Sequence, residues 1–297
     1  MTPCPVCRST NVAVYLDDAD DTLDSSKMGS SRTHLSPGTI LRCRDCGFAF
    51  RQTRFNEQQL ADLYRKMDPN VYQAELPGRI RTASYNLGIV TKNSGLDGRT
   101  GEILDIGCAS GVFLSQALDA GWQVTGLEPA EALYKEALQR IGDRGTIMPL
   151  ILEEAKLDAQ SFDAITMWDV LEHVTDPVAF LARCRELLKP GGRLLLTVPD
   201  LDSLQARLLG RRWPMLLPEH LNYFNRPSLK LCAEKSGLRL VRFGRRHSYF
   251  SMQYVFFRLS QHRIPGASLL SRAAQTRLGR ALMPVYFGDT YAVLSRS

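Results

Sequence analysis

Four cysteines near the N-terminus are spaced as two pairs that suit a zinc site. Cys4 and Cys7 form one Cys-x-x-Cys pair, and Cys43 and Cys46 form a second pair after 35 intervening residues. Each pair can place two sulfurs on one tight turn, as tetrahedral zinc sites require. We expect residues 17–38 to bulge out as a loop, since the gap exceeds the usual spacing. Four sulfur ligands predict a structural zinc, because no position stays open for catalysis; four unrelated core cysteines are the alternative.

A second group of residues predicts a ligand-binding loop between a strand and a helix. In Glu102–Gly111, a short apolar run ends in small residues, and a helix is expected at 112–120. Small residues let a ligand approach the backbone at the carboxyl end of a strand. Glu128 closes the next strand, 23 residues after Asp105, where a carboxylate can accept two ribose hydroxyls.

The glycine pattern of this loop argues against a dinucleotide site. A GxGxxG fingerprint that starts at Gly107 would need glycines where Ala109 and Val112 stand. The third glycine lets helix and strand pack closely beneath a pyrophosphate, and it is missing here. A purely structural glycine turn is the remaining alternative.

Two histidines are candidate general bases. His173 follows Glu172, and His220 lies within the segment 218–227. Three aromatic neighbours could pack a ring substrate there: Trp213, Tyr223 and Phe224. A structural role is the alternative for His173, and capping of a turn is the alternative for His220.

The elements around these residues alternate between strand and helix. Apolar runs predict strands over 102–106, 123–127, 163–167 and 193–198, with helices between them. A helix is expected to start at Asp176-Pro177 and to stop at Lys189-Pro190-Gly191-Gly192, and two further helices are expected at 56–67 and 78–94. This alternation predicts an α/β fold with a parallel sheet covered by helices on both faces.

The loop and two downstream segments resemble class I S-adenosylmethionine-dependent methyltransferases. The segments are Ser161–Val174 and Leu187–Leu196, in the order that the family has them, and the resemblance covers about residues 101–200. It implies a seven-stranded, mostly parallel, Rossmann-like sheet with a late antiparallel strand near 288–295. It also implies that these residues contact S-adenosylmethionine: Asp105, Gly107, Cys108, Ala109, Ser110, Gly111, Glu128, Pro129, Ile151, Leu152, Asp169 and Val170.

The stretch Asp169-Val-Leu-Glu172-His173 is similar to ubiquinone-biosynthesis O-methyltransferases. In that family an acid, a glutamate and a histidine at this spacing can hold a divalent cation, and oxygen and nitrogen ligands of this kind suit magnesium or zinc. A cation at Asp169, Glu172 and His173 is therefore an alternative to the use of His173 or His220 as a base.

With the cysteine pairs included, the chain resembles zinc-ribbon-bearing class I methyltransferases of surface-polysaccharide, sugar and small-molecule pathways. The resemblance implies a zinc-ribbon module at 1–54, a helical linker at 55–98 and a methyltransferase domain at 99–297. Helical lid insertions are expected at 201–212 and 248–283. O-methylation of a small, carbohydrate-linked or lipid-linked acceptor is the first functional hypothesis. A protein that only binds the donor is a further alternative.

Charge is distributed unevenly along the chain. Residues 1–200 hold 21 Lys and Arg against 27 Asp and Glu, whereas residues 201–297 hold 16 against 4. The basic part predicts an anionic partner, either a phosphorylated acceptor, RNA or a membrane surface. An rRNA or tRNA methyltransferase is thus the second hypothesis, although residues 1–54 are nearly charge-balanced. The basic stretch 239–280 contains Phe250, Tyr254, Phe256, Phe257, Leu269 and Leu270, and it predicts a lid or a membrane-bound segment.

The sequence predicts a cytoplasmic protein. The N-terminus lacks the basic and apolar regions of a secretory signal, and no run of about 18 apolar residues is present. In that compartment cysteines stay reduced, which agrees with a metal site rather than disulfides.

Overall fold

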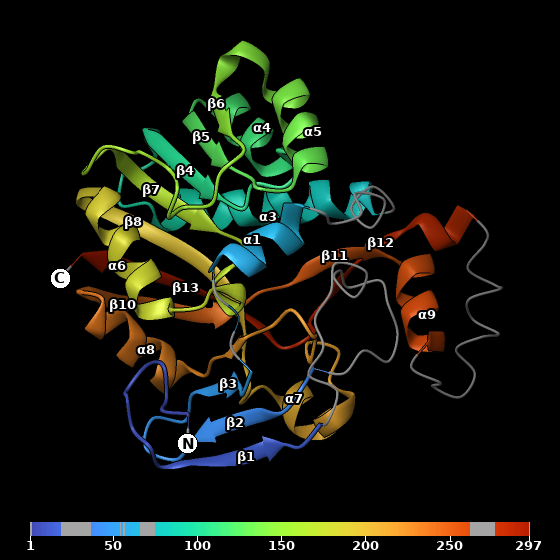
Figure 1. The fold of residues 1–297 in the computed structure, drawn as a ribbon. Helices are drawn as coiled ribbons and strands as arrows, with labels where there is room; N and C mark the ends of the chain where they lie inside the picture. Colours follow the sequence, from blue (N-terminus) through green and yellow to red (C-terminus); the bar gives the residue numbers. More distant parts are fainter. Residues whose placement is uncertain are drawn as a thin grey trace.

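A seven-stranded sheet runs through the centre of the protein (Figure 1). We describe it from a computed structural model that covers residues 2–18, 37–53, 55, 57–65, 75–261 and 277–296. The strands follow the order β10, β13, β8, β7, β4, β5, β6 across the sheet. Their bounds are β4 (Glu102–Ile106), β5 (Gln123–Leu127), β6 (Thr146–Met148), β7 (Phe162–Met167), β8 (Leu188–Pro199), β10 (Leu238–Arg245) and β13 (Asp289–Arg296).

The direction of the strands confirms the predicted fold class. Strands β8, β7, β4, β5 and β6 are parallel, and β13 inserts antiparallel between β8 and β10. The predicted strands 102–106 and 123–127 have the bounds that the sequence indicated. Strand β8 starts at Leu188, five residues earlier than expected. The Pro190-Gly191-Gly192 stretch belongs to this strand, and the pairing register with β7 shifts across it.

Helices cover both faces of this sheet, because strands such as β4 are apolar on both faces. Ile103 faces the helices α3, α4 and α5, whereas Leu104 faces α6 and α8. The bounds of the helices are α1 (Glu57–Arg65), α3 (Leu76–Asn93), α4 (Val112–Asp119), α5 (Glu131–Ile141), α6 (Pro177–Leu187) and α8 (Arg226–Lys235).

Helix α6 shows how local sequence sets these bounds. The Asp176 carboxylate accepts hydrogen bonds from the amides of Val178 and Ala179, both at 3.0 Å, and Pro177 occupies the first helical position. This is the start that the sequence predicts. The helix ends at Leu187, two residues before the predicted stop.

A smaller sheet is formed at the N-terminus, at the bottom of Figure 1. It consists of β1 (Val12–Leu16), β2 (Ile40–Cys43), β3 (Ala49–Arg51) and β9 (Asn222–Tyr223), in that order. We call residues 2–18 and 37–53 the cysteine ribbon. Most of the loop expected at 17–38 lies outside the described residues. The fourth strand, β9, lies about 170 residues after β3 in the sequence. The ribbon sheet is therefore completed by the larger domain.

The two segments expected as helical lids differ from each other. Residues 201–212 contain α7 (Leu204–Leu209) and a 3₁₀ turn, as expected for helices. The segment 248–283 is corrected in part. It begins with strand β11 (Ser248–Ser251), which pairs with β12 (Leu282–Val285), and α9 (Met252–Gln261) follows β11. The adjacent aromatic residues Tyr249 and Phe250 favour the strand. Residues 262–276, which include Leu269 and Leu270, lie outside the described residues.

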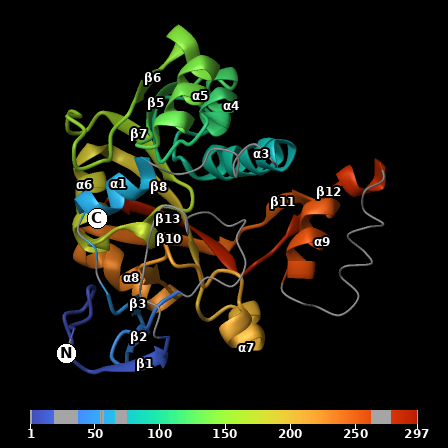
Figure 2. The same ribbon diagram turned by 45° about the vertical axis from the view of Figure 1, so that its right-hand side comes forward.

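Figure 2 shows the β11, α9 and β12 segment projecting from one side of the molecule. Strand β11 packs against α3, so this segment borders the same side of the sheet as α3. Within the described ranges, none of the helices combines the length and the apolar character needed to cross a bilayer.

Candidate active site

The loop between β4 and α4 leaves its backbone open to a cleft. Gly107 has φ of +72° and Ala109 has φ of +49°, both in the left-handed region. A Cβ on Gly107 would lie 2.8 Å from Cγ2 of Val170, so a larger residue requires movement. The amides of Gly107 and Cys108 donate to the Leu127 carbonyl at 2.8 and 3.0 Å, which ties the loop to β5. A ligand can therefore lie against bare backbone here.

Two buried carboxyl groups stand at the ends of β4 and β5. Asp105 accepts a hydrogen bond from the Thr166 hydroxyl at 2.7 Å. Glu128 accepts hydrogen bonds from the amides of Ala109 and Ala130 at 2.9 and 2.8 Å. Burial raises the pKa of Asp105 to about 7 and that of Glu128 to about 7, although these hydrogen bonds favour the ionised forms. The charge of both groups therefore responds to what binds beside them.

The cleft in front of these groups has a volume of about 490 Å³. Most of the residues expected to contact the donor line it: Asp105, Gly107, Cys108, Ala109, Ser110, Glu128, Pro129, Ile151, Leu152, Asp169 and Val170. Gly111, also expected to contact the donor, is not among the described residues that line the cleft. A Cβ on Gly111 would lie 3.1 Å from Cα of Ala137, so this glycine lets α4 pack closely on α5.

Asp169 follows β7 and is held by a buried arginine. Its two carboxylate oxygens lie 3.1 and 3.2 Å from Nη1 of Arg246, and the Thr197 hydroxyl donates to it at 2.7 Å. The Arg246 side chain is 5% exposed, whereas that of Asp169 is 48% exposed and faces the cleft. Burial raises the pKa of Asp169, but Arg246 and Thr197 outweigh this effect and lower it overall. Asp169 is therefore an ionised carboxylate on the cleft wall.

The two candidate bases, His173 and His220, come together in the lining of the cleft. Their rings meet edge to face with centroids 4.8 Å apart. Nδ1 of His173 lies 2.9 Å from the Glu219 carbonyl, and Nδ1 of His220 lies 2.9 Å from the Met215 carbonyl. A carbonyl only accepts, so each Nδ1 carries the hydrogen, and each neutral ring keeps its lone pair on Nε2.

Burial keeps both rings neutral. It lowers the pKa of His173 to about 4, and together with the neighbouring His173 ring it lowers the pKa of His220 well below its usual value. Both residues line the cleft and His220 is only 3% exposed. The pair thus presents two unprotonated nitrogens at neutral pH.

Glu172 lies beside this pair and is fully buried. Neither of its carboxyl oxygens has a hydrogen-bond partner in the described part of the chain. Burial raises the pKa of Glu172 well above its usual value, so the group is neutral unless a cation is bound.

The cation set expected from the sequence is rearranged in the structure. The ligand atoms of Glu172, His173 and His220 lie within 4.8 Å of one another, while Asp169 is committed to Arg246. The sequence could not predict this exchange, because His220 comes from a distant loop.

The three aromatic residues expected to hold a ring substrate are a further correction. Trp213, Tyr223 and Phe224 are buried in the cores of the cysteine ribbon and the main sheet, outside the cleft lining. The Trp213 indole donates to the Phe287 carbonyl at 2.6 Å, and the Tyr223 hydroxyl donates to that of Leu217 at 3.3 Å. Their polar atoms are thus used within the protein.

A sequence profile described as a methyltransferase domain matches residues 72–242, more than half of the chain. The chain belongs to this methyltransferase family. The match contains the loop at 105–111, Glu128 and both histidines of the pair, but it leaves out the cysteine ribbon and strand β13.

Curated relatives of this methyltransferase chain include two ubiquinone biosynthesis O-methyltransferases. That of Haemophilus ducreyi is 35% identical over 129 residues, which are 41% of this chain and 53% of the relative. That of Xanthomonas axonopodis pv. citri is 29% identical over 201 residues, which are 64% and 84%. The chain spans about half the length of most of the relatives compared.

The fold also matches a solved structure. An SAM-dependent methyltransferase of Leishmania major superposes with a TM-score of 0.52 at 15% identity, over 80% of this chain and 82% of that one. This similarity supports the Rossmann-like methyltransferase fold of the seven-stranded sheet.

Several cleft residues of this methyltransferase escaped the sequence analysis. Arg246 and Asp289 come from the antiparallel part of the sheet, where Asp289 is 5% exposed. Burial raises the pKa of Asp289 to about 7, and the Asp169 carboxylate adds to this effect. Tyr249 of the segment 248–283, and Phe287 beyond that segment, join Phe250 and Tyr254 at the cleft. The local sequence signal for the part of the cleft formed by Arg246 and Asp289 was Gly288, which stands directly before β13.

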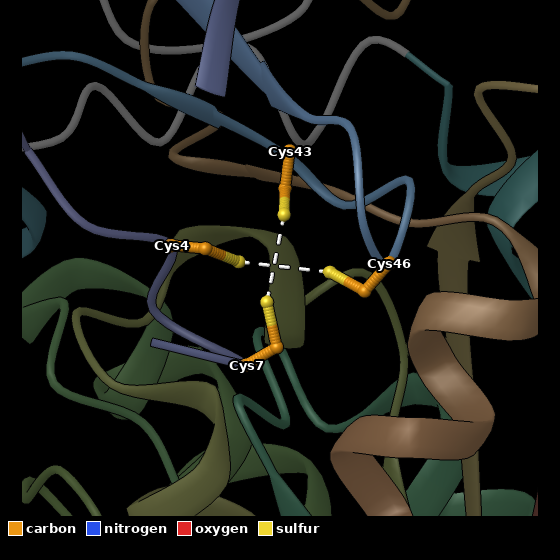
Figure 3. Close-up of side chains that lie close together, drawn as sticks. All are labelled: Cys4, Cys7, Cys43 and Cys46. Carbon is orange, nitrogen blue, oxygen red and sulfur yellow. Dashed lines mark hydrogen bonds between the residues drawn. The ribbon is translucent and has the colours of Figure 1, made fainter. Parts of the chain in front are cut away.

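The cysteine pairs of the methyltransferase chain converge as expected. Figure 3 shows the four sulfurs pointing toward a common centre. Sγ of Cys4 lies 3.6 Å from that of Cys46, and Sγ of Cys7 lies 3.5 Å from that of Cys43. Sulfurs of a zinc tetrahedron with bonds of about 2.3 Å stand about 3.8 Å apart, so the cluster fits a zinc ion after a small expansion. None of the four forms a disulfide.

Proposed function

We propose that this chain transfers a methyl group from S-adenosylmethionine to a hydroxyl group of a small-molecule acceptor. One observation carries the proposal: a single cleft joins the glycine loop and Glu128 to two neutral histidines whose Nε2 atoms carry no proton. The names of the curated relatives, which are O-methyltransferases, support the same reaction type.

The donor end of the cleft is proposed to hold S-adenosylmethionine. Gly107 leaves room for the ligand, and the carboxyl of Glu128 can accept ribose hydroxyls without losing its amide partners, because each oxygen has a second lone pair. Ile151 and Leu152 offer an apolar wall for the adenine. The donor supplies a methyl group on a positively charged sulfur, which leaves as a neutral thioether.

The histidine end is proposed to activate the acceptor. Nε2 of His220 takes the proton of the acceptor hydroxyl, and the oxygen attacks the methyl carbon as the carbon–sulfur bond breaks. His173, at 4.8 Å between ring centroids, supports His220 or takes the proton in its place. The remaining contribution of the protein is to align the two reactants in the cleft.

The lining suggests the chemical class of the acceptor. Phe113, Trp168, Tyr249, Phe250 and Phe287 bring aromatic surface to the cleft, which favours a ring-containing acceptor. Arg79 of α3 also lines the cleft and contributes a cation, consistent with an anionic substituent. A phenolic, carbohydrate-linked or lipid-linked hydroxyl compound meets these conditions.

A structural zinc ion and a lid complete the proposal. Residues 1–54 would form a zinc ribbon through Cys4, Cys7, Cys43 and Cys46, which supplies stability without taking part in the chemistry. The segment 248–283 would cover the acceptor, because Ser248, Phe250 and Tyr254 line the cleft. Contact of this segment with an anionic membrane is the other reading, and flotation with anionic liposomes tests it.

Three alternatives remain to be tested. The first is an RNA acceptor, because residues 201–297 carry an excess of basic side chains. RNA binding that weakens steeply with salt would favour it. Glu172, His173 and His220 could hold a divalent cation, in which case metal analysis would find a second metal beside zinc. A protein that only binds the donor would show binding without transfer.

The decisive experiment offers labelled S-adenosylmethionine together with separate panels of phenols, sugar nucleotides and bulk tRNA or rRNA. Mass spectrometry then identifies the acceptor by the gain of one methyl group. We expect transfer to a compound of the first or second panel. Transfer to RNA alone would overturn the proposal, and failure of calorimetry to detect donor binding would remove the donor site as well.

A further inference from the structure

The cysteine ribbon is hydrogen-bonded to the loop that carries the proposed base. Strand β9 begins two residues after His220 and pairs with β3, with Ala49 opposite Tyr223 and Phe50 opposite Asn222. We call residues 214–221 the histidine loop. The histidine loop therefore leads directly into β9, the edge strand of the ribbon sheet.

Arg51, the last residue of β3, makes the closest connection. Its side chain is 0% exposed, and Nη1 donates to the Pro218 carbonyl at 2.5 Å. Its amide donates to the Leu221 carbonyl at 3.0 Å, so the two contacts bracket His220. The guanidinium also lies 5.3 Å from the ring centre of Phe55. Burial of a guanidinium is unfavourable unless its donors are used, which indicates a specific position for this side chain.

The other side of the histidine loop is held by the turn that carries His173. The Leu221 amide donates to the Glu172 carbonyl at 2.8 Å. The Asn222 side chain donates to the carbonyls of Leu171 and Val174 at 3.1 and 2.7 Å. His220 thus sits between the ribbon and the His173 turn, and movement of either changes the distance between the two rings.

The cysteine cluster lies at the far end of the same hairpin. Strands β2 and β3 pair from Ile40 opposite Arg51 to Arg42 opposite Ala49, and Cys43 ends β2. The Cys43 amide donates to the Phe48 carbonyl at 2.8 Å, and its own carbonyl accepts from Gly47 at 3.0 Å. The conformation of this hairpin therefore depends on the conformation of the turn that carries Cys43 and Cys46.

We infer that Arg51 is a positioning residue that transmits the folded state of the cysteine ribbon to His220. The inference rests on the proposed role of His220 as the base. Donor binding should be independent of Arg51, because the amides of Gly107 and Cys108 tie the loop 105–111 to β5, whereas Arg51 bonds the histidine loop. Loss of the ribbon or of Arg51 then uncouples the two ends of the site.

The test compares Arg51→Met with Arg51→Lys and Arg42→Met in the full chain. Arg42 is the matched control, since it also leaves the ribbon to bond the main domain, at Asp202 (3.1 Å), but does not touch the histidine loop. Three quantities are measured: the imidazole carbon–proton NMR signals of His220, hydrogen exchange of the Leu221 amide, and calorimetric affinity for S-adenosylhomocysteine.

We expect Arg51→Met to shift the His220 signals and to speed exchange of the Leu221 amide by about tenfold or more, since a local closing contact is lost. Affinity for S-adenosylhomocysteine should stay within about twofold, as for distant independent sites. Arg51→Lys, which keeps a donor for Pro218, should restore most of the wild-type signals. Arg42→Met should leave them unchanged. Unchanged His220 signals in a folded Arg51→Met protein would overturn the inference.

Removal of zinc from the wild-type chain by a chelator provides a second measurement, which also serves if Arg51→Met does not fold. Movement of the His220 signals with retained S-adenosylhomocysteine binding supports the coupling, and stationary signals contradict it. Failure of the proposed function is separate, because it appears as absent ligand binding in the wild type or as full turnover of His220→Ala.

Discussion

The imidazoles of His173 and His220 meet edge to face with their centroids 4.8 Å apart, each with Nδ1 directed at a main-chain carbonyl. The fold thus fixes one tautomer for both rings. We expect His220→Ala to lower kcat by about 10²–10⁴-fold, the usual contribution of a general base, with KM for the donor unchanged. Steady-state kinetics with the identified acceptor measures this. His173→Ala is the matched variant: a larger loss there assigns the proton to His173, and full turnover of His220→Ala would refute its role.

Gly107→Arg should abolish donor binding while the protein remains folded. The side chain would enter the space beside the loop, where even a Cβ lies 2.8 Å from Val170. Calorimetry with S-adenosylmethionine and a melting curve make the measurement. Gly111→Ala is the control, because its Cβ meets Ala137 of α5 instead. It should lower stability by about 1–3 kcal/mol through overpacking, yet still bind the donor. Donor binding by Gly107→Arg would remove the loop from the site.

Donor affinity should rise with pH between 6 and 8. Burial raises the pKa of Glu128 to about 7, and ribose hydroxyls bind its ionised form. Below the folded-state pKa the ligand must first displace a proton, so affinity falls about tenfold per pH unit at the acidic end. Calorimetry at several pH values tests this, with Glu128→Gln as the control that should bind more weakly and lose this share of the pH dependence. An identical profile in both proteins would exclude Glu128 from ribose binding.

Cys43→Ser should release the metal and destabilise the cysteine ribbon, because structural zinc contributes directly to folding free energy. Elemental analysis should find about one zinc per chain in the wild type and none in the variant. Cys184→Ala, at a buried core cysteine outside the cluster, should lower stability and keep the zinc. Zinc that persists in Cys43→Ser would point to the site at Glu172, His173 and His220.

Much of the fold follows from local sequence, because its elements are regular. The apolar run at 102–106 and the Asp176-Pro177 start are decided within a few residues, and the structure confirms both. Strand β9 could not be predicted. It has two residues, and it forms only because β3 offers an open edge.

The site likewise has parts that the sequence predicts and parts that it does not. The loop at 105–111 and Glu128 follow strands in the sequence, so their meeting at one edge was predictable. Arg246 and Asp289 reach the cleft through the antiparallel pairing of β10 and β13, which no local pattern encodes. Tyr223 was misassigned because an aromatic residue near a site has the same sequence signature whether it lines the cleft or fills the core.

The pairing of β3 with β9 also has a consequence for the order of events during synthesis. The hairpin that carries the cysteines is translated before its partner strand, because Pro218, the acceptor for Arg51, is made 167 residues later. During that interval β3 is an unprotected edge strand, the kind of surface that recruits other nascent chains. Early capture of zinc would keep the hairpin in shape until its partner arrives. The cysteine hairpin is therefore translated well before its sheet can be completed.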